Sequence, residues 1–141
     1  MKNLTFETCS IDDRKAVLDG INNYNLSKVS ALSDLWTSLD FVARDDRGKV
    51  IGGILAGIGY WNGLEINTLW IKEEFRKKGV GTSLLKHVEK LAAEKGATIS
   101  ILDTFDFQAE KFYLKNGYKP IGEIKDFPKG HRRIYFSKVI Q

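Results

Sequence analysis

Three basic residues followed by two closely spaced glycines are the part of this sequence best suited to chemistry. Arg76-Lys77-Lys78-Gly79-Val80-Gly81 stands between a strand-like segment, 64–71, and an amphipathic segment that begins at Val80. The first turn of a helix exposes unpaired backbone N–H groups and the positive end of the helix dipole. Glycines let phosphates approach such a backbone closely, and basic side chains add charge at the rim. The segment therefore predicts a pyrophosphate site.

Two other phosphate-binding loops are excluded by the same residues. A P-loop requires Gly-x-x-x-x-Gly-Lys-Ser/Thr, which this sequence lacks. The dinucleotide fingerprint Gly-x-Gly-x-x-Gly requires a third glycine where Leu84 stands.

The segments before this loop alternate between helical and extended patterns. Residues 4–9 are predicted as a strand, and a helix capped by Asp12 follows, with its apolar residues at helical spacing. A second helix is expected within 26–38. Residues 41–43 and 50–58 are predicted strands joined by a turn at 45–48, and 64–71 is the next strand.

The segments after the loop begin with the clearest helix of the chain. Val80, Leu84, Val88 and Leu91 share one helical face, and Gly96 is expected to end that helix. Residues 98–103 are a predicted strand, 108–115 a short helix, and 118–124 and 134–139 the last two strands. The order indicates a mixed α/β domain, mostly antiparallel in its first half, with a crossover helix after residue 79.

Size and composition indicate an ordinary globular protein. The 141 residues fit one domain, 1–141, and the contents of 43% hydrophobic and 28% charged residues are typical of soluble domains. No apolar run reaches the roughly 18 to 20 residues of a membrane span, and the first residues do not resemble a signal peptide. The single cysteine, Cys9, fits a reducing compartment. A cytoplasmic location is therefore expected.

Two motifs together resemble one known family. Arg-x-x-Gly-x-Gly between a strand and an amphipathic helix resembles the acetyl-CoA-binding motif of the GNAT N-acetyltransferase superfamily. The segment 107–118, in which Phe112-Tyr113 precedes Gly117-Tyr118, resembles the second cofactor segment of that superfamily. The resemblance implies a central, twisted, mostly antiparallel sheet of six to seven strands flanked by about four helices.

The resemblance also implies which residues contact acetyl-CoA. Backbone amides of the loop would hold the pyrophosphate, the main chain of the preceding strand would pair with the pantetheine arm, and the short helix would flank the cofactor. The asparagine that often opens the second family segment is absent here, where Asp106-Phe107-Gln108 stands. The implied cofactor residues are Leu69, Trp70, Ile71, Arg76, Lys77, Lys78, Gly79, Val80, Gly81, Thr82, Gln108, Ala109 and Phe112.

Two residues are candidates for catalysis. Tyr113 matches the family tyrosine that protonates the departing thiolate, although a core aromatic is the competing interpretation. Glu65 stands eleven residues before Arg76, an offset similar to that of the base in the histone-acetylating branch. An alkylamine has a pKa of about 10.4, so a base or a water relay must remove its proton. An ordinary exposed glutamate, with ordered water as the base, is the alternative.

Other polar and aromatic residues have weaker patterns. Trp36, Tyr60 and Trp61 are candidates for the acceptor pocket or for the core. Asp103 and Asp106 are interpreted as turn and cap residues at the end of a strand, although an active-site edge would lie there. His87 and His131 are interpreted as surface residues, and with Cys9 they give no metal-ligand spacing.

The sequence thus favours transfer of an acetyl group from acetyl-CoA to a primary amine of a small molecule or protein, in a ternary complex without a metal. A non-catalytic module that senses acyl-CoA is the alternative. A nucleic-acid interaction through the basic loop is a weaker idea, because the net charge of +4 is modest. Neither a nucleic-acid nor a membrane partner is expected, and a homodimer is left open. The acceptor itself and the acyl-chain specificity are not determined by these motifs.

Overall fold

The computed structural model describes residues 3–141, which divide into two units, one ending at Ala31 and the other spanning Leu32–Gln141. The first unit contains helix α1 (Ile11–Lys28). Ser10 caps it, because the Asp13 N–H donates to the Ser10 hydroxyl at 3.1 Å and the Ser10 N–H donates to the Asp13 carboxylate at 3.0 Å. The predicted cap at Asp12 is therefore wrong by two positions. The predicted strand over 4–9 is also wrong, since these residues pair with no strand.

The second predicted helix, within 26–38, is not formed. The backbone leaves α1 at Val29, and residues 36–38 instead form strand β1 (Trp36–Ser38). The N–H groups of Leu32 and Ser33 donate to the Tyr60 carbonyl at 2.7 and 3.1 Å, and these bonds tie the segment to a sheet rather than to its own helix. The described residues therefore contain three α-helices where about four were expected.

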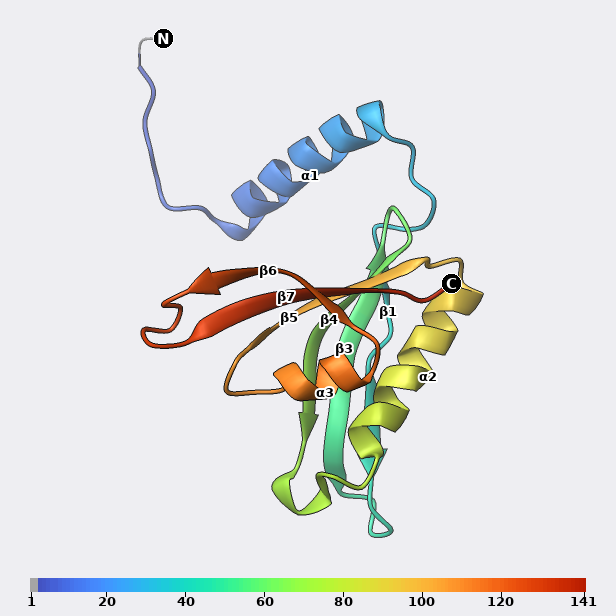
Figure 1. Cartoon of the computed structure of the whole chain (residues 1–141). Coiled ribbons are helices and arrows are strands. Elements are labelled where there is room, and N and C mark those ends of the chain that lie inside the picture. The colour runs from blue at the N-terminus through green and yellow to red at the C-terminus, as the bar shows by residue number, and fades with distance from the viewer. Residues whose placement is uncertain (1–2) are drawn as a thin grey trace. The chain divides into compact units, whose positions relative to one another are not determined.

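A seven-stranded, mostly antiparallel sheet forms the second unit, as the sequence predicted (Figure 1). The strand order is β1-β3-β4-β5-β7-β6, and β2 pairs with β3. Only β4 and β5 run parallel, because helix α2 crosses over between them. The remaining strands are β2 (Phe41–Arg44), β3 (Val50–Gly59), β4 (Gly63–Ile71), β5 (Ile99–Phe105), β6 (Lys119–Lys125) and β7 (Arg132–Val139).

The hydrophobic core lies between one face of this sheet and two helices, α2 (Val80–Glu94) and α3 (Glu110–Lys115). Leu85 and Val88 of α2 and Tyr113 of α3 are buried against alternate strand residues such as Leu102 and Phe136. The intervening strand residues face the other way. We call that side, which carries Glu65, Ile101, Asp103 and Tyr135, the outer face.

Helix length and hydropathy give no membrane-spanning candidate among residues 3–141.

Candidate active site

The basic loop forms a cradle at the start of α2. Lys77 and Gly79 both have left-handed backbones, with φ of 60° and 84°. These two left-handed residues turn the backbone into α2. The first hydrogen bond of the helix is donated by the Ser83 N–H to the Gly79 carbonyl at 2.9 Å. The N–H groups of the three preceding residues, Val80 to Thr82, have no partner within the helix. They are free to bind an anion where the helix dipole is positive.

Three elements meet at this cradle. A Cβ added to Gly81 would lie 3.3 Å from the Phe112 ring of α3 and 3.6 Å from Ile71 of β4. The Arg76 side chain returns to the same strand end, where its Nε donates to the Ile71 carbonyl at 2.8 Å. The loop, the end of β4 and α3 are thus brought together as expected. A glycine-floored cradle of backbone N–H groups and basic side chains fits a pyrophosphate group.

Strands β4 and β5 separate before β4 reaches the cradle at Ile71. Their pairing ends at Ile66 and Leu102, and the register of β4 against β3 shifts at Asn67. This bulge bends β4 away from β5 and leaves the β5-facing edge of its last residues without a strand partner. A cavity of about 180 Å³ opens there. It is lined by Ile66, Asn67, Thr68, Leu69, Asp103, Thr104, Gln108, Ala109 and Tyr113.

Tyr113 borders the cavity from the core side. Its ring packs edge-on against Phe112 and Tyr118, with centroids 5.1 and 5.7 Å away. Burial, and secondarily the negative charge of Asp103, raises the pKa of Tyr113 to about 12. Tyr113 is therefore a core aromatic that also lines the cavity, and its role in catalysis stays a prediction.

Asp103 borders the cavity from the outer face. The Arg133 guanidinium donates to its Oδ1 through Nε and Nη2, both at 2.9 Å, and no residue among 3–141 bonds to its Oδ2. Asp103 lies inside β5, so its interpretation as a turn residue is wrong. The alternation of buried Leu102 and Thr104 with exposed neighbours was the signal for its true position. Asp106 does lie in the turn after β5, and its Oδ2 accepts the Arg132 N–H at 3.2 Å.

Glu65 lies on the outer face of β4 and does not line the cavity. The side chain of Trp36 lies across Gly57, which is the pairing partner of Glu65 on β3. Tyr60 and Trp61 pack together in the β3–β4 turn, with ring centroids 5.8 Å apart, and neither lines the cavity. The structure thus places Trp36 near Glu65, and it brings none of the three predicted acceptor aromatics to the cavity wall.

Other predicted cofactor residues differ in how many of their polar groups are already hydrogen-bonded and in how exposed their side chains are. The Gln108 side-chain oxygen accepts the Phe105 N–H at 2.9 Å and the Thr104 hydroxyl at 3.2 Å, which leaves its amide nitrogen for a ligand. The side chains of Lys77 and Lys78 are exposed at the rim of the cradle, and Trp70 is half-exposed on β4.

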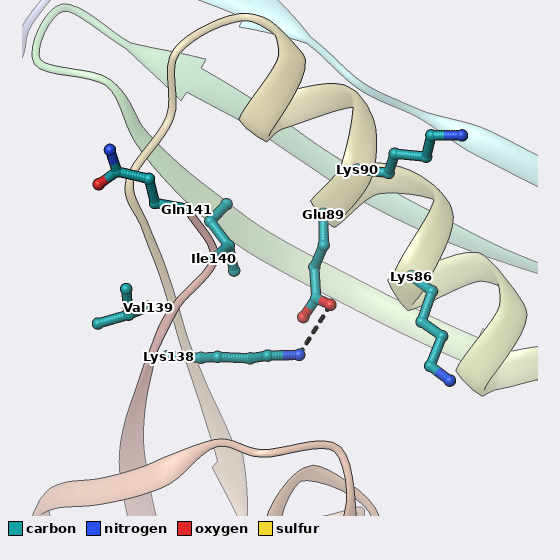
Figure 2. Close-up of a pocket in the computed structure, with 7 residues that line it drawn as sticks. All are labelled: Lys86, Glu89, Lys90, Lys138, Val139, Ile140 and Gln141. Carbon is teal, nitrogen blue, oxygen red and sulfur yellow. Dashed lines mark hydrogen bonds and ion pairs between the residues drawn. The ribbon is translucent and has the colours of Figure 1, made fainter.

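A second cavity, of about 260 Å³, lies away from this site, along α2 and the end of β7 (Figure 2). Figure 2 shows the Glu89 carboxylate directed at Lys138, whose ammonium group lies 2.9 Å away. Tyr118 donates to the other oxygen of Glu89 at 2.7 Å and contacts the Ser100 hydroxyl at 2.7 Å. These residues form a buried polar network. In contrast, Lys86 and Lys90 in Figure 2 point away from it.

The histidines have structural contacts. The His87 ring packs edge-on against Phe41 at 4.6 Å, and His131 pairs with Asp106 at 2.9 Å. No group of three His, Cys, Asp or Glu residues within 3–141 is arranged to hold a metal ion.

Comparison with known proteins identifies the family of this chain. The model of the acetyltransferase (GNAT) family matches residues 13–118, so the chain belongs to that family. Over 86 residues it is 35% identical to the blasticidin-S acetyltransferase of Streptomyces morookaense, a match that covers 60% of this chain and 62% of that relative.

Solved structures share the fold. An acetyltransferase from Bacillus cereus superposes with a TM-score of 0.88 at 31% identity, over 96% of this chain and 97% of that one. An aminoglycoside 6′-N-acetyltransferase complexed with coenzyme A superposes with a TM-score of 0.66 at 23% identity, over 74% of this chain and 73% of that one.

Proposed function

We propose that this protein transfers the acetyl group of acetyl-CoA to a primary amine of a small molecule. The observation that carries the proposal is the cavity between β4 and β5, which Tyr113 and Asp103 both line, on a strand whose end at Ile71 packs beside Gly81 of the anion cradle. The small-molecule acceptor is further supported by the names of relatives that act on blasticidin S or aminoglycosides.

Acetyl-CoA would supply an activated thioester. The N–H groups at the start of α2 would bind its pyrophosphate, and the free edge of β4 at Leu69–Ile71 would pair with its pantetheine arm. Asp103 would hold the amine in the cavity. The amine nitrogen bonds to the acetyl carbon, the carbon–sulfur bond breaks, and the ammonium proton passes to a carboxylate or to water.

Tyr113 would act on the departing sulfur. Because its pKa is raised to about 12, the phenol stays neutral and can donate a hydrogen bond throughout the neutral range. Full proton transfer to a thiolate of ordinary pKa, about 8.5, would be uphill by roughly 5 kcal/mol. We therefore assign Tyr113 mainly to hydrogen-bond stabilisation of the developing thiolate rather than to complete protonation.

Thiol release from acetyl-CoA in the presence of a panel of amines tests the proposal. We expect acetylation of at least one small amine and a loss in kcat of about 100-fold in Tyr113→Phe, at the lower end of the range for removal of one hydrogen-bond donor to a developing anion. Calorimetric affinity for coenzyme A should change little in that variant, because the phenol would contact the sulfur and not the pyrophosphate.

A non-catalytic sensor of acyl-CoA would give a different result. Acetyl-CoA would bind tightly, but no amine in the panel would release thiol above the rate of solvent hydrolysis. The Tyr113→Phe variant would then be indistinguishable from the unmodified protein. That outcome would contradict the enzymatic proposal while leaving the cofactor site intact.

A further inference from the structure

The outer face carries a carboxylate that has no protein partner. No hydrogen bond or ion pair joins the Glu65 carboxylate to any residue among 3–141, and the residue is exposed. Asp103, by contrast, is held by Arg133 and borders the cavity. The two carboxylates therefore differ both in what they contact and in where they lie relative to the reacting atoms.

Glycines place an indole ring next to Glu65. A Cβ on Gly57 would lie only 2.2 to 2.8 Å from atoms of the Trp36 ring, so the ring rests directly on the β3 backbone. Gly57 pairs with Glu65, and Gly59 pairs with Trp36. A Cβ on Gly59 would lie 3.8 Å from Oε2 of Glu65. The carboxylate and the aromatic ring thus share one small area of the sheet.

A free carboxylate beside an indole is a combination that binds organic cations. The carboxylate provides charge and hydrogen-bond acceptors, and the ring adds a cation–π contribution of about 0.5 to 2 kcal/mol. Trp36 is 41% exposed, so the ring is within reach of a ligand.

The two carboxylates are separated by a distance that a small molecule can span. Glu65 pairs with Ile101 on the parallel strand β5, and Asp103 follows two residues later. From strand spacing and rise, their Cα atoms lie roughly 8 Å apart. An amine presented to the cavity at Asp103 and a second ammonium group at Glu65 would fit one short, flexible chain.

We infer that Glu65 and Trp36 form an anchor for a second cationic group of the acceptor, and that the preferred substrates are therefore diamines or larger polyamines. This inference rests on the proposed function and names its substrate class. Glu65 then binds substrate instead of receiving the proton of the reacting amine, a role left to Asp103 or water at the cavity.

The test compares 1,4-diaminobutane with butylamine as acceptors. We expect kcat/KM to be at least about tenfold higher for the diamine, which corresponds to one charge-assisted hydrogen bond. Glu65→Gln and Trp36→Leu should each lower the ratio of kcat/KM for the diamine to kcat/KM for butylamine by about tenfold. This loss should come from a higher KM for the diamine. Gly57→Ala should have the same effect, because its methyl group displaces the indole. The matched control Glu94→Gln, at an exposed carboxylate of α2, should retain the full preference.

Two results would overturn the inference. The first is equal use of both amines by the unmodified protein. The second is a Glu65→Gln variant that loses kcat equally for both amines, which is the pattern of a missing proton acceptor. Calorimetry with the protein saturated with coenzyme A measures the affinity for each amine without turnover, and so tests the anchor separately from catalysis. Preferential diamine binding that depends on Glu65, without acetylation of any amine, would support the anchor and contradict the proposed reaction.

Discussion

At the scale of single residues, the two glycines of the cradle fulfil different requirements. Gly79 needs its freedom of backbone conformation, since its φ is 84° and a Cβ there would meet nothing within 4 Å. Gly81 has no such φ but sits against Phe112, so it supplies space. The motif Gly-x-Gly therefore combines a conformational glycine with a steric one.

We expect Gly81→Val to weaken coenzyme A binding by more than tenfold, because its side chain would displace Phe112 and enter the cradle. Isothermal calorimetry measures this, with circular dichroism to confirm a folded domain. Gly122→Ala is the matched control, since Gly122 has open space and no left-handed backbone. An unchanged affinity in folded Gly81→Val would mean that the phosphates bind elsewhere.

At the scale of elements, the buried network around Glu89 joins α2 to β7 and to Tyr118 at the start of β6. The Glu89 side chain is only 10% exposed, and its charge is balanced by Lys138, which is 25% exposed. Burial of a charge is tolerated when it is paired and hydrogen-bonded, and it becomes costly when one partner is removed.

Lys138→Met should therefore lower the free energy of unfolding by about 3 kcal/mol, because it leaves the Glu89 carboxylate without its counterion. Denaturant titration measures the change. Lys86→Met removes a lysine from the same cavity wall that does not contact Glu89, and it should change the unfolding free energy by less than about 0.5 kcal/mol. Equal effects of the two substitutions would show that the ion pair does not stabilise the junction.

At the scale of the whole molecule, two buried tyrosines make the free energy of unfolding depend on pH in the alkaline range. Burial raises the pKa of Tyr113 to about 12, and burial together with the Glu89 carboxylate raises that of Tyr118. A phenol with a higher pKa in the folded chain stabilises the fold while it is protonated. This contribution is complete below a pH of about 10 and is lost as the pH rises toward 12.

We expect the difference in unfolding free energy between the unmodified protein and Tyr113→Phe to shrink by up to about 2 to 3 kcal/mol from pH 9.5 to pH 12. Urea titrations at several pH values measure it, and the comparison cancels the titration of the lysines and of Tyr118. A difference that is constant over this range would show that the Tyr113 hydroxyl is as well solvated in the folded as in the unfolded chain.

Local patterns in the sequence determined the cradle, the amphipathic helix α2 and most strands, because their glycines, caps and alternation act over a few neighbouring residues. The same patterns misplaced Asp103 and predicted a helix where β1 forms, since Leu32 and Ser33 bond to Tyr60, which is distant in sequence. Assignment of the chain to one domain, its location and its oligomeric state remain predictions.

The end of pairing between β4 and β5 was decided only by the tertiary structure. It requires a bulge at Asn67 and a parallel crossover, and both depend on how strands pair rather than on which residues they contain. The sequence by itself thus predicted which segment would hold the acetyl donor. The tertiary structure decided that Tyr113 of α3 and Asp103 of β5 line one cavity and that Trp36 of β1 lies over Gly57, the pairing partner of Glu65, because these neighbours come from different elements of the chain.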